Sequence, residues 1–405
     1  MQLPDKQLTG PNFTTRNLRM SMRALLTRID KAVALESDDA AIRISADYQP
    51  QAGVGAKVFP PTYMEHDGTR YHFENRWRPD GHPSEVVILD SYQSQANRCE
   101  AALEREAAAL GLPRIVMRYR VDGRVIEISS LEAPHRSRDA YFLDSRLGGK
   151  PFDDSEIGSA LNEAGLKDLT PYLEYAPTDL VYGVWDSHRG KRLALKFARS
   201  YTSEILGWDP ERGKRAATKG DPLNLPGGDQ VFTRDWRVEG SSSKSSKERS
   251  KLSDLGHGMI PDQPDGAAGG VAVRAITRLG VLSLTGLARH EFGSTPRDVA
   301  GRTALAAIGL LGDRLAFGAA GIHLRSGSDL VLVSDSLEWV QRGGRTEPLN
   351  LSQNDARELF DLAKSRLPES GVRWSSEPLV VEPSQELARV IKGVLTAGGA
   401  GQEGV

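Results

Sequence analysis

The sequence VVILDSYQSQANRCE, residues 86–100, joins a short apolar run to a dense block of polar side chains. The apolar run predicts a buried strand at residues 86–89, and the residues after it have the spacing of a helix that continues to residue 110. The polar block therefore falls in the first turns of that helix. Unpaired backbone N–H groups and a partial positive charge at a helix start favour an anionic ligand such as phosphate. Ordinary capping of the helix by Ser94 or Asp90 is the alternative interpretation.

Strand and helix patterns alternate on both sides of this segment. RIVMRYRVDGRVIEISS, residues 114–130, predicts a hairpin with Asp122 and Gly123 as its two-residue turn. Asp153 and Glu156 have the spacing of a capping box, and Ser352 precedes another helix pattern as its cap. Further strands are predicted at residues 41–48, 180–185, 193–197, 271–276 and 330–334. Helices are predicted within the first thirty residues and at residues 137–143, 154–164, 283–290, 298–311, 354–365 and 384–395. The mixture predicts the α+β class.

The composition is that of a soluble globular protein, with 39% hydrophobic and 26% charged residues among 405. We expect a cytoplasmic protein with no membrane partner, because no apolar run approaches the roughly 20 residues of a membrane helix and no signal-peptide pattern begins the chain. The single cysteine, Cys99, excludes an internal disulfide and a cysteine-clustered zinc site. Its helical setting among alanines predicts a small buried side chain.

The formal net charge of −2 is low for a nucleic-acid-binding protein. The basic residues are nevertheless clumped, since residues 189–199 contain five Lys and Arg and no acid. A second clump lies at residues 212–219. Such clumps permit a positive groove on a nearly neutral protein, although a solvated surface is the other interpretation.

Four short segments carry a family resemblance: SYQSQANR (91–98), HRSRD (135–139), VWDSH (184–188) and ARSYTSEI (198–205). In this order they resemble the CRISPR-associated RAMP protein that forms the repeated backbone subunit of the type I-U, or type I-G, Cascade complex (the Cas-seven group). The resemblance extends from about residue 35 to residue 332. It implies an RRM-like (ferredoxin-like) RAMP core with large insertions, one of them a thumb-like loop.

This resemblance divides the chain into five parts. We expect an N-terminal extension (1–34), a first part of the core (35–207), a thumb-like mobile insertion (208–257), a second part of the core with C-terminal helices (258–395) and a disordered tail (396–405). Residues 240–251 are rich in Ser and Lys, with too little apolar surface to offset the entropy of ordering.

The implied function is to bind guide RNA (crRNA), to polymerise along it and to present its bases to target DNA. Further copies of the chain, a large subunit, a fused guide-end and processing subunit and a recruited helicase-nuclease are the other implied partners. Base pairing would then carry sequence specificity while the protein contacts the backbone. The RNA-contact residues we predict are Ser94, Gln95, Asn97, Arg98, His135, Arg136, His188, Lys196, Arg199, Arg274 and Arg325.

An RNA-cleaving RAMP enzyme with a histidine general acid or base is the alternative, and His135 and His188 are its candidates. The histidines show no HExxH spacing, and the glycine pairs at residues 148–149, 227–228, 269–270 and 343–344 form neither a GxGxxG nor a Walker A pattern. We therefore expect a protein that is not an enzyme and has no metal or other cofactor.

Overall fold

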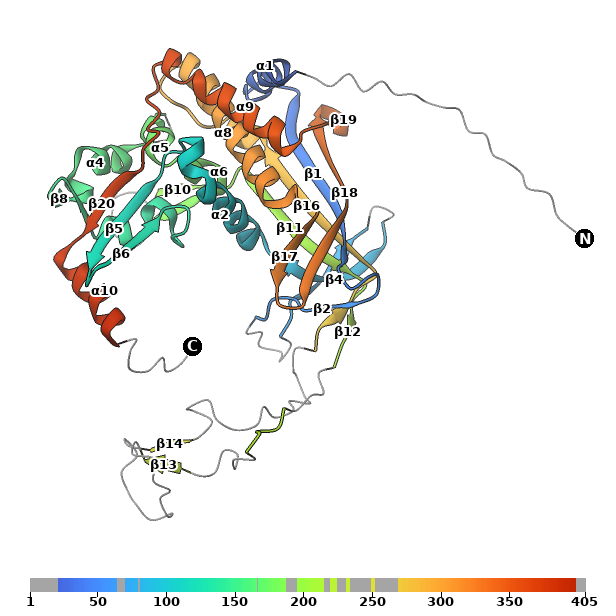
Figure 1. Ribbon diagram of the computed structural model, residues 1–405. Coiled ribbons are helices and arrows are strands. Elements are labelled where there is room, and N and C mark those ends of the chain that lie inside the picture. Colours follow the sequence, from blue (N-terminus) through green and yellow to red (C-terminus); the bar gives the residue numbers. More distant parts are fainter. Residues whose placement is uncertain are drawn as a thin grey trace, which may run out of the picture.

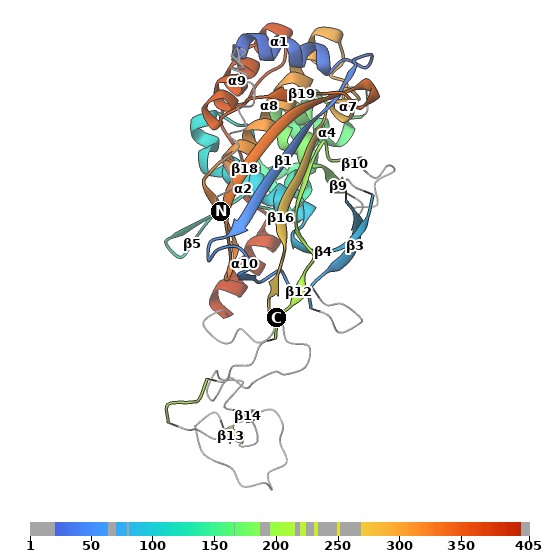
Figure 2. The same ribbon diagram turned by 90° about the vertical axis from the view of Figure 1, so that its right-hand side faces the viewer.

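The computed structural model describes residues 21–63, 70–78, 81–165, 167–186, 195–214, 219–223, 231–233, 249–251 and 269–397. Its largest layer is an eight-stranded sheet (Figures 1 and 2). Seven strands lie in the order β17-β18-β1-β16-β11-β4-β3, β19 pairs with β18, and every pairing is antiparallel. The strands are β1 (Asp39–Pro50), β3 (Phe73–Trp77), β4 (Pro83–Asp90), β11 (Tyr201–Trp208), β16 (Ala275–Ser283), β17 (Gly321–Arg325), β18 (Ser328–Gln341) and β19 (Thr346–Leu349).

The main sheet has one buried and one open face. Along β1, Ile42 and Ile44 are fully buried whereas Arg43 between them is exposed, as the two-residue period of a strand requires. Helices cover the buried face (Figure 1), and the strands β18, β1 and β16 run side by side across the view in Figure 2. The first and second predicted parts of the core thus contribute to one sheet, because β1 pairs with both β16 and β18.

Helix α8 (Thr295–Phe317) is the centre of the helical layer. Every residue from 300 to 314 is buried, because α8 contacts α1, α2, α6, α7 and α9 as well as β16. A Cβ on Gly312 would lie 2.2 Å from Oη of Tyr182, so glycine is required where the two helices approach. Cys99 of α2 lies at the same contact and is completely buried, as predicted. The neighbouring helices are α1 (Met22–Ala32), α2 (Tyr92–Leu110), α5 (Thr170–Tyr175), α6 (Pro177–Tyr182), α7 (Leu284–Leu287) and α9 (Gln353–Ser365).

A second, five-stranded sheet lies on the other side of the helices (Figure 1), in the order β6-β5-β20-β7-β8. Its β5–β6 hairpin is the one predicted from sequence. Asp122 and Gly123 both have positive φ, 48° and 76°, as a two-residue turn of this kind needs. The elements are β5 (Ile115–Val121), β6 (Arg124–Ser129), β7 (Ser145–Leu147), β8 (Lys150–Pro151) and β20 (Leu379–Pro383), with α3 (Ala140–Leu143), α4 (Glu156–Glu163) and α10 (Gln385–Ala397) beside them.

Three small sheets complete the described structure. They are β2 (Lys57–Val58) with β15 (Val271–Ala272) and β12 (Glu211–Arg212), β9 (Val184–Asp186) with β10 (Leu195–Phe197), and β13 (Val231–Thr233) with β14 (Arg249–Lys251). Four short 3₁₀ helices lie at Arg136–Arg138, Phe152–Asp154, Arg342–Gly344 and Pro368–Ser370. Most of the predicted thumb-like insertion, residues 208–257, lies outside the described residues, and so does the predicted tail after residue 397, where α10 ends.

Several local predictions need correction. The strand predicted at residues 180–185 is helix α6 up to Tyr182, because Pro177 at its first position fits a helix start. Only residues 184–186 are strand. Helix α4 is capped by Ser155, whose hydroxyl accepts from the backbone N–H of Gly158, and not by Asp153. The strand predicted at residues 271–276 is broken into β15 and β16. Ser352 does cap α9, in a capping box with Asp355.

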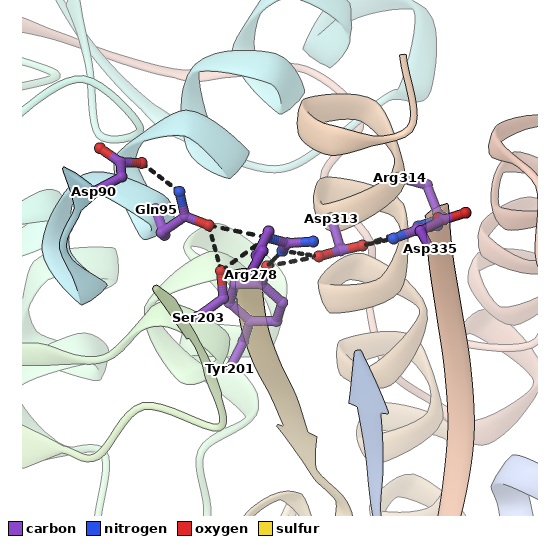
Figure 3. A network of polar contacts seen from close by, with 8 residues as sticks. All are labelled: Asp90, Gln95, Tyr201, Ser203, Arg278, Asp313, Arg314 and Asp335. Atoms are coloured by element: carbon purple, nitrogen blue, oxygen red, sulfur yellow. Dashed lines mark hydrogen bonds and ion pairs between the residues drawn. The ribbon is translucent and has the colours of Figure 1, made fainter. Parts of the chain in front are cut away.

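A chain of polar groups joins strand β16 of the main sheet to the helices α2 and α8 that pack on it (Figure 3). The Arg278 guanidinium of β16 is fully buried, donates to Oε1 of Gln95 at 3.0 Å, and forms an ion pair with the equally buried Asp313 of α8. Asp313 also accepts from Oη of Tyr201 at 2.7 Å and from Arg314. Burial alone would lower the pKa of Arg278 and raise that of Asp313, but their mutual attraction outweighs it in both cases.

The chain therefore has a mixed α/β structure with a curled antiparallel sheet, and the predicted α+β class is confirmed. None of the described helices has the length and apolar character needed to cross a membrane.

Candidate functional site

Helix α2 begins where the sequence predicted, directly after β4. Its cap is Ser91, whose hydroxyl accepts from the backbone N–H of Ser94, so neither Ser94 nor Asp90 is the capping residue. Gln93 and Asn97 project from the exposed side of the helix, four residues apart. The polar block at the helix start is thus divided between an outer and an inner side.

Gln95 lies on the inner side and is completely buried. Its amide donates to Asp90, and its carbonyl oxygen accepts from Ser203 and from Arg278 (Figure 3). The predicted RNA contact of Gln95 is therefore wrong for this structure, because its amide atoms are used inside the core.

Arg98 and Arg325 use their guanidinium groups in contacts within the fold. The Arg98 guanidinium pairs with Asp90, at 2.8 Å from Nε to Oδ2, and donates to the backbone carbonyls of His323 and Leu324, each at 3.0 Å. Arg325 donates to the carbonyl of Pro60 at 2.9 Å. These two arginines tie the start of α2 and the edge strand β17 to their surroundings.

Two adjoining hollows lie beside the exposed side of α2. Both are lined by Pro134, Arg136 and Arg199, and their volumes are about 410 and 400 Å³. The first is completed by His135, residues 182–185 and residues 196–198. The second is completed by Gln93, Asn97, Glu100, Ala101 and residues 131–133. Five of the predicted contact residues therefore come together: Asn97, His135, Arg136, Lys196 and Arg199.

A buried ion pair fixes Arg136 between the hollows. Its Nε and Nη2 lie 2.6 and 2.8 Å from the two oxygens of Glu100, and its Nη1 donates to the carbonyl of Gly183 at 2.9 Å. Arg136 itself has φ 52°, a conformation that is uncommon outside glycine. Burial raises the pKa of Glu100 against the opposing effect of Arg136. The pair therefore leaves little free charge from Arg136 at the surface.

Lys196 and Arg199 are the exposed cations of the site. Within the part of the chain that the structure describes, neither side chain has a hydrogen bond or an ion pair. Burial of part of its side chain and the nearby Arg136 charge lower the pKa of Arg199. An exposed cation without a carboxylate partner is stabilised when an anion binds beside it.

His135 is exposed next to these cations, and its backbone N–H donates to Asp139 at 3.1 Å. Asn97 adds an exposed amide that can donate to a phosphate oxygen. The site thus combines two unpaired cations with polar groups from α2 and from the loop before the 3₁₀ helix at residues 136–138.

The remaining predicted residues lie elsewhere. Arg274 is exposed at the far end of β11 and β16, where its backbone N–H donates to the carbonyl of Trp208. Trp208 is seven residues along β11 from Tyr201, or roughly 23 Å at the rise of a strand. Ser94 is half-buried and lines neither hollow. His188 lies outside the described residues. Asn97, Arg136 and Arg199 therefore share one surface, whereas Arg274 belongs to another.

Sequence reasoning missed two residues that shape the site. Glu100 was not among the predicted residues, whereas its carboxylate pairs with Arg136. Gly183 has φ 85°, and a Cβ there would lie 2.9 Å from Cγ of Arg199. The glycine between two apolar runs was the available signal, since glycine in such a place often marks close approach of another segment.

The described residues include no group of three or more His, Cys, Asp or Glu side chains placed to hold a metal ion. What the site offers is an α+β scaffold with a cation-lined surface, a combination suited to an anionic polymer.

Residues 42–212 match the family model of CRISPR-associated protein GSU0053. The matched segment is less than half of the 405-residue chain, but it runs from β1 to β12 and contains all the residues that line the two hollows. The chain is thus similar to a CRISPR-associated protein, and this similarity supports a role in a CRISPR system. A search of curated proteins finds no match.

Proposed function

We propose that this protein binds guide RNA as the backbone subunit of a type I-G Cascade effector. The observation that carries the proposal is the position of Lys196 and Arg199: two unpaired cations share a hollowed surface with Asn97 and His135, inside the segment that matches the CRISPR-associated family. Lysine and arginine bind phosphate oxygens whatever the base, so such a surface suits an RNA whose bases must stay available for pairing.

The order of the elements supports an RRM-like core. The succession β1-α2-β11-β16-α8-β18, with β18, β1, β16 and β11 adjacent in that order, is that of a ferredoxin-like sheet. Strand β4 then extends this sheet beyond β11, and the second sheet is an insertion between α2 and β11 that also takes up β20 from the end of the chain. RNA-binding domains of this general plan are common.

In this proposal several copies lie side by side along one guide, and the guide pairs with target DNA. The other Cascade subunits and a recruited helicase-nuclease complete the system. Coexpression with a CRISPR array, followed by purification and sequencing of bound RNA, tests this directly. Guide-sized RNA of the array is the expected product, and a purified protein free of RNA would contradict the proposal.

Salt dependence tests the phosphate contacts. Replacing both Lys196 and Arg199 by Ala should reduce the slope of log K against log salt by about 1.4, since each phosphate contact to a single strand contributes about 0.7. The loss should be equal for two unrelated RNA sequences. Arg345→Ala is the matched control, because Arg345 is exposed beside β19 and lines neither hollow. An unchanged slope in the double variant would remove Lys196 and Arg199 from the interface.

The proposal assigns no catalytic step to the protein. Labelled guide precursor incubated with the purified chain should therefore remain intact on a denaturing gel. Cleavage that is lost in His135→Ala would replace the proposal with the endoribonuclease alternative.

A further inference from the structure

The β9–β10 hairpin has one face buried in the core, and residues of both its strands line the first hollow. Val184, Asp186 and Phe197 are buried, and Phe197 packs edge-to-face on Tyr172 with ring centroids 4.9 Å apart. Because strand residues alternate between faces, the residues next to these must point the other way. The anchored face thus fixes the orientation of Trp185 and Lys196.

Trp185 and Lys196 are direct cross-strand partners in this hairpin. Side chains opposite each other in an antiparallel pair have their Cβ atoms about 4.5–5.5 Å apart on the same face. Both side chains line the first hollow together with His135 and Arg199. An indole ring and two cations therefore border the same hollow.

Trp185 is a large apolar side chain with much of its surface exposed. It is 59% exposed although it sits on an anchored hairpin next to buried residues. Covering an exposed indole with another flat apolar surface releases water and is favourable. A nucleobase offers such a surface, and surfaces that bind single strands combine stacking aromatics with cations for the backbone.

We propose that Trp185 stacks on an unpaired nucleobase of the RNA strand whose phosphates Lys196 and Arg199 hold. This inference rests on the proposed RNA-binding function and adds to it a contact with the base. A duplex keeps its bases stacked within the helix, so the site selects single-stranded over double-stranded RNA. One base beside each Trp185 is held by the protein instead of by its neighbours in the strand.

The test compares an ordinary single-stranded RNA oligonucleotide with an abasic oligonucleotide of the same length, which keeps the phosphates and lacks the bases. Trp185→Ala should weaken binding of the ordinary RNA by about 5- to 150-fold, the effect of losing one base–aromatic stack. The abasic RNA should bind wild type and Trp185→Ala equally. Trp185→Phe should retain most of the affinity because it retains a ring.

Trp77→Ala is the matched control. Trp77 is 74% exposed in β3 and lines neither hollow, so its removal should leave RNA affinity unchanged. Equal melting temperatures of wild type and Trp185→Ala would exclude a loss of folding in the variant. The comparison of ordinary with abasic RNA can also be made with wild type alone, so it does not depend on the folding of any variant.

The outcomes separate this inference from the function on which it rests. Wild type that binds neither oligonucleotide overturns both. Wild type that binds both equally well, with Trp185→Ala unchanged, overturns the stacking role and leaves phosphate binding standing. If Trp185→Ala lowers the affinity for both oligonucleotides by the same factor, the stacking role is also overturned, because the tryptophan then supports the structure of the site without contacting a base.

Discussion

Single residues in the core of this protein are tied together by charge as well as by apolar contact. Arg278 and Asp313 are both fully buried, and their pairing brings in Tyr201, Gln95 and Arg314 (Figure 3). A buried ion pair is costly to desolvate, so its removal as a whole can be mild, whereas removal of one partner leaves an uncompensated charge.

Asp313→Asn should therefore lower the free energy of unfolding by about 3–5 kcal/mol, because it leaves the Arg278 guanidinium buried without its carboxylate. Chemical denaturation followed by circular dichroism measures this change. Asp361→Asn on α9 is the control: Asp361 is exposed, its pair with Lys364 is a surface pair, and the change should stay below about 1 kcal/mol. Equal effects of the two substitutions would contradict a central role for the buried pair.

Asp179 couples folding to pH beneath the site. It is fully buried and accepts from the hydroxyl of Ser137, and its Oδ1 has no hydrogen-bond partner among the described residues. Burial raises its pKa to about 7, against an ordinary value of 3.8. The folded state thus holds a proton that the unfolded state releases, so the contribution of Asp179 to stability is full below pH 3.8 and is lost as pH rises towards 7.

The stability of wild type relative to Asp179→Asn should accordingly fall between pH 4 and pH 7, by at most about 1.4 kcal/mol per pH unit. Burial lowers the pKa of His290 to about 4, so His290 contributes the opposite slope between about pH 4 and 6.5. His290→Gln is therefore the informative control, since it should change the profile in the opposite direction. Denaturant midpoints measured across this pH range provide the comparison, and parallel profiles for wild type and Asp179→Asn would refute the role of Asp179.

At the scale of elements, the junction of β4 and α2 positions much of the site, and its cap can be tested. Ser91→Ala should destabilise the protein by about 0.5–2 kcal/mol because the N–H of Ser94 loses its side-chain acceptor. Ser94→Ala, three residues further on, should cost less, since Ser94 provides the donor from its backbone only. Thermal melts of the two variants suffice, and a larger effect at Ser94 would show that the cap is misassigned.

Elements with strong local signals were predictable from sequence. The β5–β6 hairpin carries its turn in Asp122 and Gly123, and α9 carries its cap in Ser352, so both were predicted correctly. The strand predicted at residues 180–182 was wrong because a short apolar run is equally compatible with a buried helix and a buried strand. Here tertiary packing decides, since α6 packs against α8.

In the candidate site, too, some residues were predictable from sequence and others were not. The basic clump gave Lys196 and Arg199, because charge density is a property of the sequence itself. Gln95 could not be assigned correctly, because its partner Arg278 is 183 residues away. The sequence does not show which polar residue at a helix start points into the core, because that depends on a contact with a distant strand.

At the scale of the whole molecule, the main sheet depends on strands from both ends of the chain. Strand β1 has β16 on one side and β18 on the other, so a fragment of residues 1–207 lacks both neighbours. Expressed alone, this fragment should aggregate or lack a cooperative thermal transition, because unpaired strand edges and one apolar face are exposed.

The control experiment retains both parts of the chain that contribute strands to the main sheet. A chain cut by a protease site introduced within residues 240–248 should remain associated on a sizing column, since the pairings of β1 with β16 and β18 lie outside that segment. Separation of the two pieces without denaturant would show that the sheet is held less firmly than its pairing indicates.

The position of Cys99 has a practical consequence. Its side chain is fully buried, and burial raises the pKa of the thiol to about 12, so the nucleophilic thiolate is scarce at neutral pH. Maleimide reagents should leave the native protein unlabelled and modify it after denaturation. In the variant Arg345→Cys, the introduced cysteine should then be the thiol that a fluorophore labels in the native protein. Cys99 would not have to be removed for such spectroscopy.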